Sequence, residues 1–218
     1  DYDLFPESPV RRFNKLVLRG CFTDSWGLVS WDAGRYRPND SQYFRDVWMK
    51  ESLRAMGQPS SYGAFCHVYV NGLYMGLFNH TERLEDDFYA SHFGGQEADW
   101  EVNADLSAPG PRWNAMMALS QYAAFPAYVD LANFADYMLL HFFADAEDWP
   151  HHNGYAATNP AIGFPYRFFV WDQEIVLDNH GINRIADARG AGALMQKLRG
   201  FPEFRHHAAL SRASSALS

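Results

Sequence analysis

Two acidic residues and an amide are spaced as the polar groups of a phosphoryl-transfer site commonly are. Asp148 and Asn153 stand five positions apart in the segment DWPHHN, and Asp172 follows the apolar run FFVW. In such sites one carboxylate receives the proton of the acceptor hydroxyl, while an Asn and a second Asp hold the metal ion that bridges the nucleotide phosphates. We therefore predict Asp148 as the catalytic residue, and Asn153 and Asp172 as ligands of Mg²⁺ or Mn²⁺ beside bound ATP. A loop in which Asp148 caps a backbone amide is the structural alternative.

Glu174 is a candidate for a further metal ligand. If the strand that contains Trp171 continues, side chains two positions apart point to the same side, so Glu174 and Asp172 lie together. Carboxylate oxygens are donors that suit Mg²⁺ and Mn²⁺. An ordinary strand end with two solvated acids is the alternative interpretation.

Two residues are candidates for the nucleotide site. Arg19 ends the strand-like segment NKLVLR and could hold phosphate oxygens, although a structural pair with Asp24 or Asp46 would explain it equally well. Glu82 follows a predicted hairpin, where a connector to a second lobe could meet the nucleotide base. A solvated turn is the alternative for Glu82. The sequence contains no glycine-rich phosphate loop, which counts against a conventional kinase.

A metal-dependent hydrolase is the second reading of the same loop. His151 and His152 lie beside Asp148, and with Asp172 they could hold Zn²⁺ or a pair of metals. However, neighbouring His side chains in an extended segment are expected to diverge, and neither H-E-x-x-H nor H-x-H occurs. Serine hydrolysis has little support because the chain has no G-x-S-x-G.

The local patterns predict an α+β fold with a small mixed lobe followed by a mainly helical lobe. Asn-Gly between two β-rich runs predicts a hairpin with a type I′ turn. We place the first lobe at residues 1–95, a linker at 96–112 and the second lobe at 113–218, with a ligand cleft between the lobes. Strands are expected at 14–19, 65–70, 73–78 and 166–171, and helices at 41–56, 84–93, 113–122, 131–144 and 192–198.

Composition narrows the class of protein. Aromatic residues make up 17% of the 218 residues and the formal charge is −8, which fits a globular domain and argues against nucleic-acid binding. No apolar run is long enough for a membrane span. Two cysteines form no metal motif, so we expect two free thiols. Neither the compartment nor the oligomeric state follows from the sequence.

Several stretches together resemble the spore coat protein H (CotH) kinase family. They are KLVLRG, FRDVWMKESLRAMGQPS, HVYVNGLYMGLFNHTERLEDDF, WNAMMAL, DWPHHNGYAA and YRFFVWDQE, in this order along residues 10–178. The resemblance implies a divergent protein-kinase-like fold that uses ATP and Mg²⁺ to phosphorylate Ser or Thr of a protein substrate. It implies Asp148 as the catalytic Asp, Asn153 and Asp172 as metal ligands, and Glu82 and Arg19 as the hairpin-end Glu and the Arg of the LR motif. It also implies a bacterial protein, exported or at the cell surface.

The chain departs from the family pattern in ways that bear on activity. Members carry a basic, phosphate-contacting segment upstream of the first strand, and this chain starts too late to include it. The region 101–112 is shorter than the usual spacer, and the chain ends early. We therefore expect a truncated member. An inactive pseudokinase or a cell-surface binding module is the alternative to an active kinase.

Overall fold

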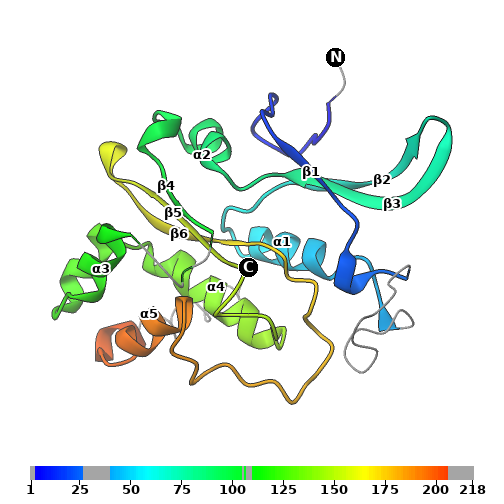
Figure 1. The fold of residues 1–218 in the computed structure, drawn as a ribbon. Helices are drawn as coiled ribbons and strands as arrows, with labels where there is room; N and C mark the ends of the chain where they lie inside the picture. The colour runs from blue at the N-terminus through cyan, green and yellow to red at the C-terminus, as the bar shows by residue number, and fades with distance from the viewer. Residues whose placement is uncertain (1–2, 27–39, 105, 107–109, 206–218) are drawn as a thin grey trace.

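Two small antiparallel sheets and five α-helices make up the described part of the chain. The computed structural model describes residues 3–26, 40–104, 106 and 110–205. The first sheet has the order β1-β3-β2 and the second β4-β5-β6. In Figure 1 the first sheet lies at the upper right, while helices α3, α4 and α5 gather below the second sheet. This mixture of sheets and helices confirms the α+β class, whereas a kinase-like arrangement in two lobes stays a prediction.

The first sheet is built on the predicted hairpin. It consists of β1 (Leu16–Arg19), β2 (Gly63–Val70) and β3 (Leu73–Glu82). Asn71 and Gly72 connect β2 to β3 with φ angles of 51° and 81°, the positive values that a type I′ turn requires. The turn prediction is therefore confirmed. The antiparallel pairing of β1 with β3, in which Arg19 lies opposite Asn79, makes Arg19 the last residue of an outer strand.

The second sheet was only partly anticipated. It consists of β4 (Glu101–Asn103), β5 (Gly154–Asn159) and β6 (Phe164–Val170). The strand β4 lies inside the expected linker 96–112 and pairs with β5, with Glu101 opposite Thr158. This segment is therefore more than a linker, because it supplies one strand of the sheet that carries β6. The division into lobes at 1–95 and 113–218 otherwise stays a prediction.

The helices follow the expected order with shifted ends. They are α1 (Arg45–Ala55), α2 (Asp86–Phe93), α3 (Pro111–Met117), α4 (Leu131–Phe143) and α5 (Ala191–Leu198). The first helix was expected from residue 41 but begins at Arg45, and Phe44, which precedes it, gives no side-chain cap. The third helix begins at Pro111 because proline suits the first helical position. Among the described residues, no helix combines the length and the apolar character that crossing a membrane requires.

Strand β6 separates two hydrophobic cores. Phe168 and Val170 pack in the larger core with α4, whereas Phe169 and the following Trp171 pack in a smaller core with α2. This alternation is the ordinary consequence of a strand covered on both faces. Asp172 comes directly after Trp171, two residues beyond the end of β6, so its position depends on a strand that both cores hold.

Candidate active site

The residues predicted for phosphoryl transfer line a common pocket. It has a volume of about 280 Å³. Its walls come from the end of β1, the loop after α4 and the segment after β6, and they contain Arg19, Gly20, Cys21, Phe22, Thr23, Asp148, Asn153, Asp172, Glu174 and Ile175. The structure thus brings Asp148, Asn153 and Asp172 to one place, although the role of each stays a prediction.

The loop that carries Asp148 is anchored to α4 by an aromatic side chain. Trp149 is fully buried, its indole Nε1 donates a hydrogen bond to the Tyr137 hydroxyl at 2.9 Å, and its ring stacks on His141 with centroids 4.6 Å apart. The Asn153 amide lies 3.4 Å from Asp148 Oδ2. A rigid anchor one residue from Asp148 is what a positioned carboxylate needs.

Arg19 joins the two acidic residues that follow β6. Its Nη2 atom pairs with Asp172 and lies 2.6 Å from Glu174 Oε1. The strand ends at Val170 and Asp172 has a φ of 55°. Glu174 does lie near Asp172, but not because a continuing strand points both side chains to the same side. The two carboxylates meet because both bind the same guanidinium.

Glu174 and Asp172 differ in how available they are. The side chain of Glu174 is 6% exposed and that of Asp172 is 44% exposed. The second oxygen of Glu174 accepts hydrogen bonds from the backbone N and the hydroxyl of Thr23, both at 2.8 Å. Burial raises the pKa of Glu174, against the opposing effect of Arg19 and Thr23. Both oxygens of Glu174 are therefore engaged, whereas Asp172 faces the pocket with free surface.

Two residues of α1 complete the charge network. The pair of Arg19 with Asp46, the structural alternative for Arg19, is confirmed, whereas the part of Lys50 was not expected. Asp46 lies 2.8 Å from Lys50 Nζ and 3.5 Å from Arg19 Nε, and it accepts a hydrogen bond from the Gln173 backbone. Burial alone would raise the pKa of Asp46, but Lys50 and Arg19 hold it below its usual range. The spacing of an Asp and one of only three lysines four positions apart on a predicted helix was the available signal.

Three cations surround the indole of Trp171, next to Asp172. Arg19, Lys50 and Arg83 lie 5.1, 5.2 and 5.2 Å from its ring centroid. Cations near an aromatic face are attracted by its quadrupole, and the surrounding acids raise the pKa of Arg19 further, so its charge is permanent. Three basic side chains thus lie around Trp171, close to Asp46, Asp172 and Glu174, the acids that pair with Arg19.

Glu82 is not among the residues that line the pocket. It is buried at the end of β3, where one oxygen accepts from the Tyr62 backbone at 2.8 Å and the other lies 2.7 Å from His92 Nε2. A solvated turn at this position is therefore wrong. The contact with His92 links β3 to α2. Neither contact supports a role for Glu82 in nucleotide binding, and that role stays a prediction.

His151 and His152 do not diverge as expected. Their ring centroids lie 4.6 Å apart. One ligand atom from each of Asp148, His151 and His152 lies within 4.8 Å of the others. Asp172, the fourth residue of the hydrolase hypothesis, is not part of that group.

A comparison with family models adds an independent observation. The family model described as CotH kinase protein matches residues 36–121. The match is consistent with the CotH resemblance and suggests a CotH-like kinase, a transferase of phosphoryl groups. No curated protein matches the chain. The CotH match covers α1 with Asp46 and Lys50, whereas Asp148, Asn153 and Asp172 lie beyond it, so their roles depend on the pocket and on the local motifs.

Proposed function

We propose that this chain is a CotH-type protein kinase that transfers the γ-phosphoryl group of ATP to a Ser or Thr hydroxyl of a protein. One observation carries the proposal: Asp148, Asn153 and Asp172, which come from two segments after α4 and β6, line one pocket next to Arg19. Such a set contains a carboxylate for the acceptor hydroxyl, two oxygen ligands for a metal and a cation for phosphate.

Asp148 is the residue that would receive the hydroxyl proton or orient the hydroxyl. Its side chain is 38% exposed at the pocket, so an acceptor side chain can reach it. Asn153 and Asp172 supply the neutral and charged oxygen atoms that Mg²⁺ or Mn²⁺ prefers, and these donors therefore fit the metal. When bound, the metal would neutralise charge on the phosphates. Glu174, whose oxygens are engaged by Arg19 and Thr23, is better placed to hold Arg19 than to join the metal ligands.

The shared guanidinium couples the metal to the nucleotide. Arg19 pairs with Asp172 in the structure. A divalent ion bound to Asp172 would compete with Arg19 for that carboxylate, and a phosphate group would compete with Asp172 for Arg19. A metal ion that took Asp172 from Arg19 would leave the guanidinium held by Glu174 and Asp46, with Nη2 freed toward a phosphate group. We therefore expect ATP and Mg²⁺ to bind more tightly together than separately.

The test is transfer of labelled γ-phosphate to the chain itself or to a Ser-rich basic peptide, with and without Mg²⁺. Asp148→Asn should lower the rate by about 100-fold or more, the usual contribution of a positioned acid–base group. Asp172→Asn should lower it because a charged oxygen ligand of the metal is lost. Asp145→Asn is the matched control, because Asp145 pairs with His180 in the same region and does not line the pocket. Near-native transfer by Asp148→Asn would refute the assignment.

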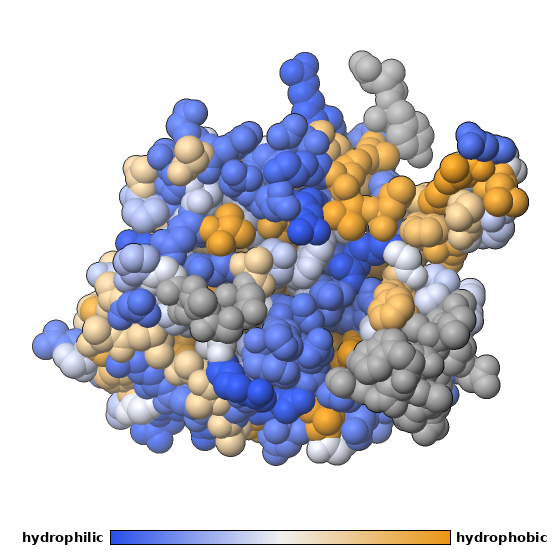
Figure 2. Space-filling view, in the orientation of Figure 1, coloured by the Kyte–Doolittle hydropathy of each residue, from blue (hydrophilic) through white to orange (hydrophobic). Residues whose placement is uncertain are grey.

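A binding module is the second candidate, because the hairpin exposes apolar side chains. Figure 2 shows hydrophobic residues gathered on the projecting hairpin. The exposed large side chains there are Tyr69, Val70, Leu73, Tyr74 and Met75. Exposed apolar surface of this kind commonly marks a contact with another molecule. Calorimetry with ATP and Mg²⁺ separates the two functions, since a pure adhesion module should give no binding heat.

A further inference from the structure

We propose that Asp148, His151 and His152 form a second metal site, selective for a borderline transition-metal ion such as Zn²⁺, and that its occupation inhibits the proposed phosphotransfer. The binding part stands on the geometry of these three side chains alone. The inhibitory part rests on the proposed function, because it requires Asp148 to serve the acceptor hydroxyl.

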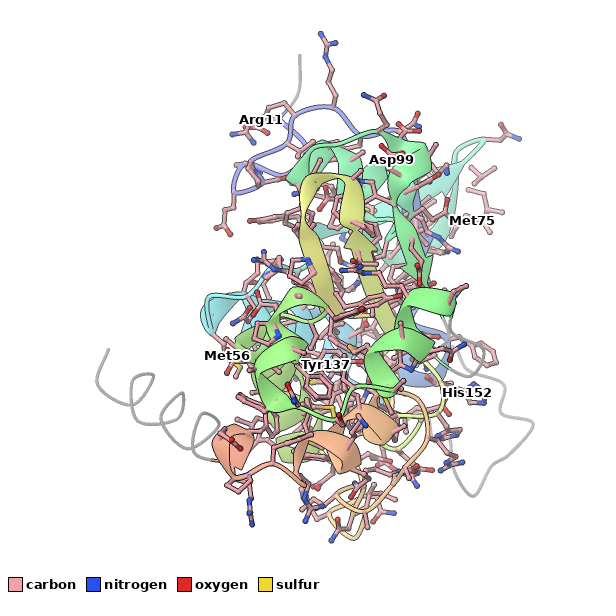
Figure 3. The ribbon with its side chains drawn as sticks, turned by 90° about the vertical axis from the view of Figure 1, so that its left-hand side faces the viewer. Arg11, Met56, Met75, Asp99, Tyr137 and His152 are labelled. Atoms are coloured by element: carbon pink, nitrogen blue, oxygen red, sulfur yellow. The ribbon has the colours of Figure 1, made fainter. Side chains whose placement is uncertain are left out.

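The three side chains are nearly at ligand spacing. His151 Nε2 lies 3.7 Å from Asp148 Oδ1, and one ligand atom of each residue lies within 4.8 Å of the other two. Zinc ligands sit about 2.0–2.1 Å from a tetrahedral ion, which places neighbouring ligand atoms roughly 3.3–3.4 Å apart. Closing the remaining gap needs only small side-chain rotations. His152 is exposed and lies at the surface in Figure 3.

The ligand atoms are not committed to other partners within the described part of the chain. His151 Nδ1 is buried without a hydrogen-bond partner, and the distance from His151 Nε2 to Asp148 exceeds that of a hydrogen bond. Asp148 turns Oδ2 toward Asn153 and Oδ1 toward His151. One carboxylate therefore serves two neighbouring sites, one with oxygen ligands and one with nitrogen ligands.

The nearby cations oppose the site only weakly. Arg189 and Arg184 both contribute to the lowered pKa of His151. However, Arg189 is paired with Asp187 at 2.6 Å, and Arg184 donates a hydrogen bond to the Glu147 carbonyl. With three protein ligands, a fourth position stays open for water or substrate. Imidazole favours Zn²⁺ over Mg²⁺. Zn²⁺ should therefore prefer the site with His151 and His152, and Mg²⁺ the site with oxygen ligands.

Calorimetric titration of the full chain with Zn²⁺ tests the binding part. We expect one ion per chain, and at least tenfold weaker affinity for His152→Ala and for His151→Ala. His180→Ala is the matched control, because His180 is also exposed and lies 3.2 Å from an aspartate, Asp145, but belongs to no three-residue group among the described residues. Unchanged affinity in His152→Ala, with far-ultraviolet circular dichroism showing that it folds, would overturn the site.

Inhibition is tested by adding Zn²⁺ to the phosphotransfer assay at excess Mg²⁺. The zinc concentration that halves the rate should rise at least tenfold in His152→Ala relative to the wild type and to His180→Ala, each compared with its own rate without zinc. Equal inhibition of all three proteins would overturn the inhibitory role. Stoichiometric zinc binding by a chain without any phosphotransfer would leave the metal site standing and refute the proposed kinase, so the two failures are distinguishable.

Discussion

Replacing His141 with Phe should make the protein more resistant to mild acid. His141 is fully buried on α4, and its Nδ1 lies 2.7 Å from the Tyr137 carbonyl. A carbonyl only accepts, so Nδ1 carries the proton and Nε2, which has no partner among the described residues, must stay unprotonated. The ring stacks on Trp149, the anchor of the loop that carries Asp148. Charging this ring would place an unpaired cation under the proposed active site.

The size of the effect follows from the pKa. Burial lowers the pKa of His141 from 6.5 to about 3, against a smaller opposing effect of the Tyr137 carbonyl. Because the folded pKa lies below the unfolded one, stability from this group is full above the unfolded pKa. It is lost as the pH falls from the unfolded value toward the folded one. Protonation favours unfolding by about 1.4 kcal/mol per pH unit in that range, or about 2 kcal/mol between about pH 7 and pH 5.

Urea unfolding of the wild type and His141→Phe at these two pH values measures the effect. The other titrating groups contribute equally to both proteins, so the difference in pH dependence isolates His141. We expect the free energy of unfolding of His141→Phe to fall by about 2 kcal/mol less than that of the wild type. Parallel pH dependence of wild type and His141→Phe would refute a buried neutral ring.

Two further changes test the frame of the site. Arg19→Gln removes the shared partner of Asp172 and Glu174 and should lower the free energy of unfolding by about 3 kcal/mol, the low end for breaking a buried pair. Lys15→Gln, which removes an exposed pair with Glu85, should change it far less. A loss below about 1 kcal/mol for Arg19→Gln would contradict the burial argument. Gly190→Ala should be at least about 2 kcal/mol worse than Gly163→Ala in urea unfolding. The added Cβ would lie 2.0 Å from the Pro150 carbonyl oxygen, whereas Gly163 shares a positive φ but has open space; equal losses would show that only backbone strain matters.

Turns, strands and helices that depend on short stretches of sequence could be predicted. Asn71 and Gly72 specify the hairpin because both positions need a positive φ, and the observed φ angles confirm it. The apolar run before Asp172 predicts a buried strand. The helices lie close to where the spacing of apolar residues predicts them. The candidate site residues could also be named, because the spacing of Asp148 and Asn153 and the acid after a strand are visible in a short window of sequence.

Contacts across long stretches of chain could not be read in this way. The strand β4 is three residues long and has no recognisable pattern of its own, so only its pairing with β5 makes it a strand. Glu82 was expected at the nucleotide, yet its burial against Tyr62 and His92 depends on where α2 packs.

The sequence alone therefore determined which groups could do chemistry, since hairpin turns, amphipathic helices and the acid after a buried strand depend on neighbours within a few positions. Tertiary structure decided which of those groups share a pocket. Arg19 binds an acid 153 positions away, and Asp46 enters the same network from a helix between them. Those pairings depend on how two sheets and a helix pack, and packing is set by the burial of both hydrophobic cores and not by any local pattern of residues.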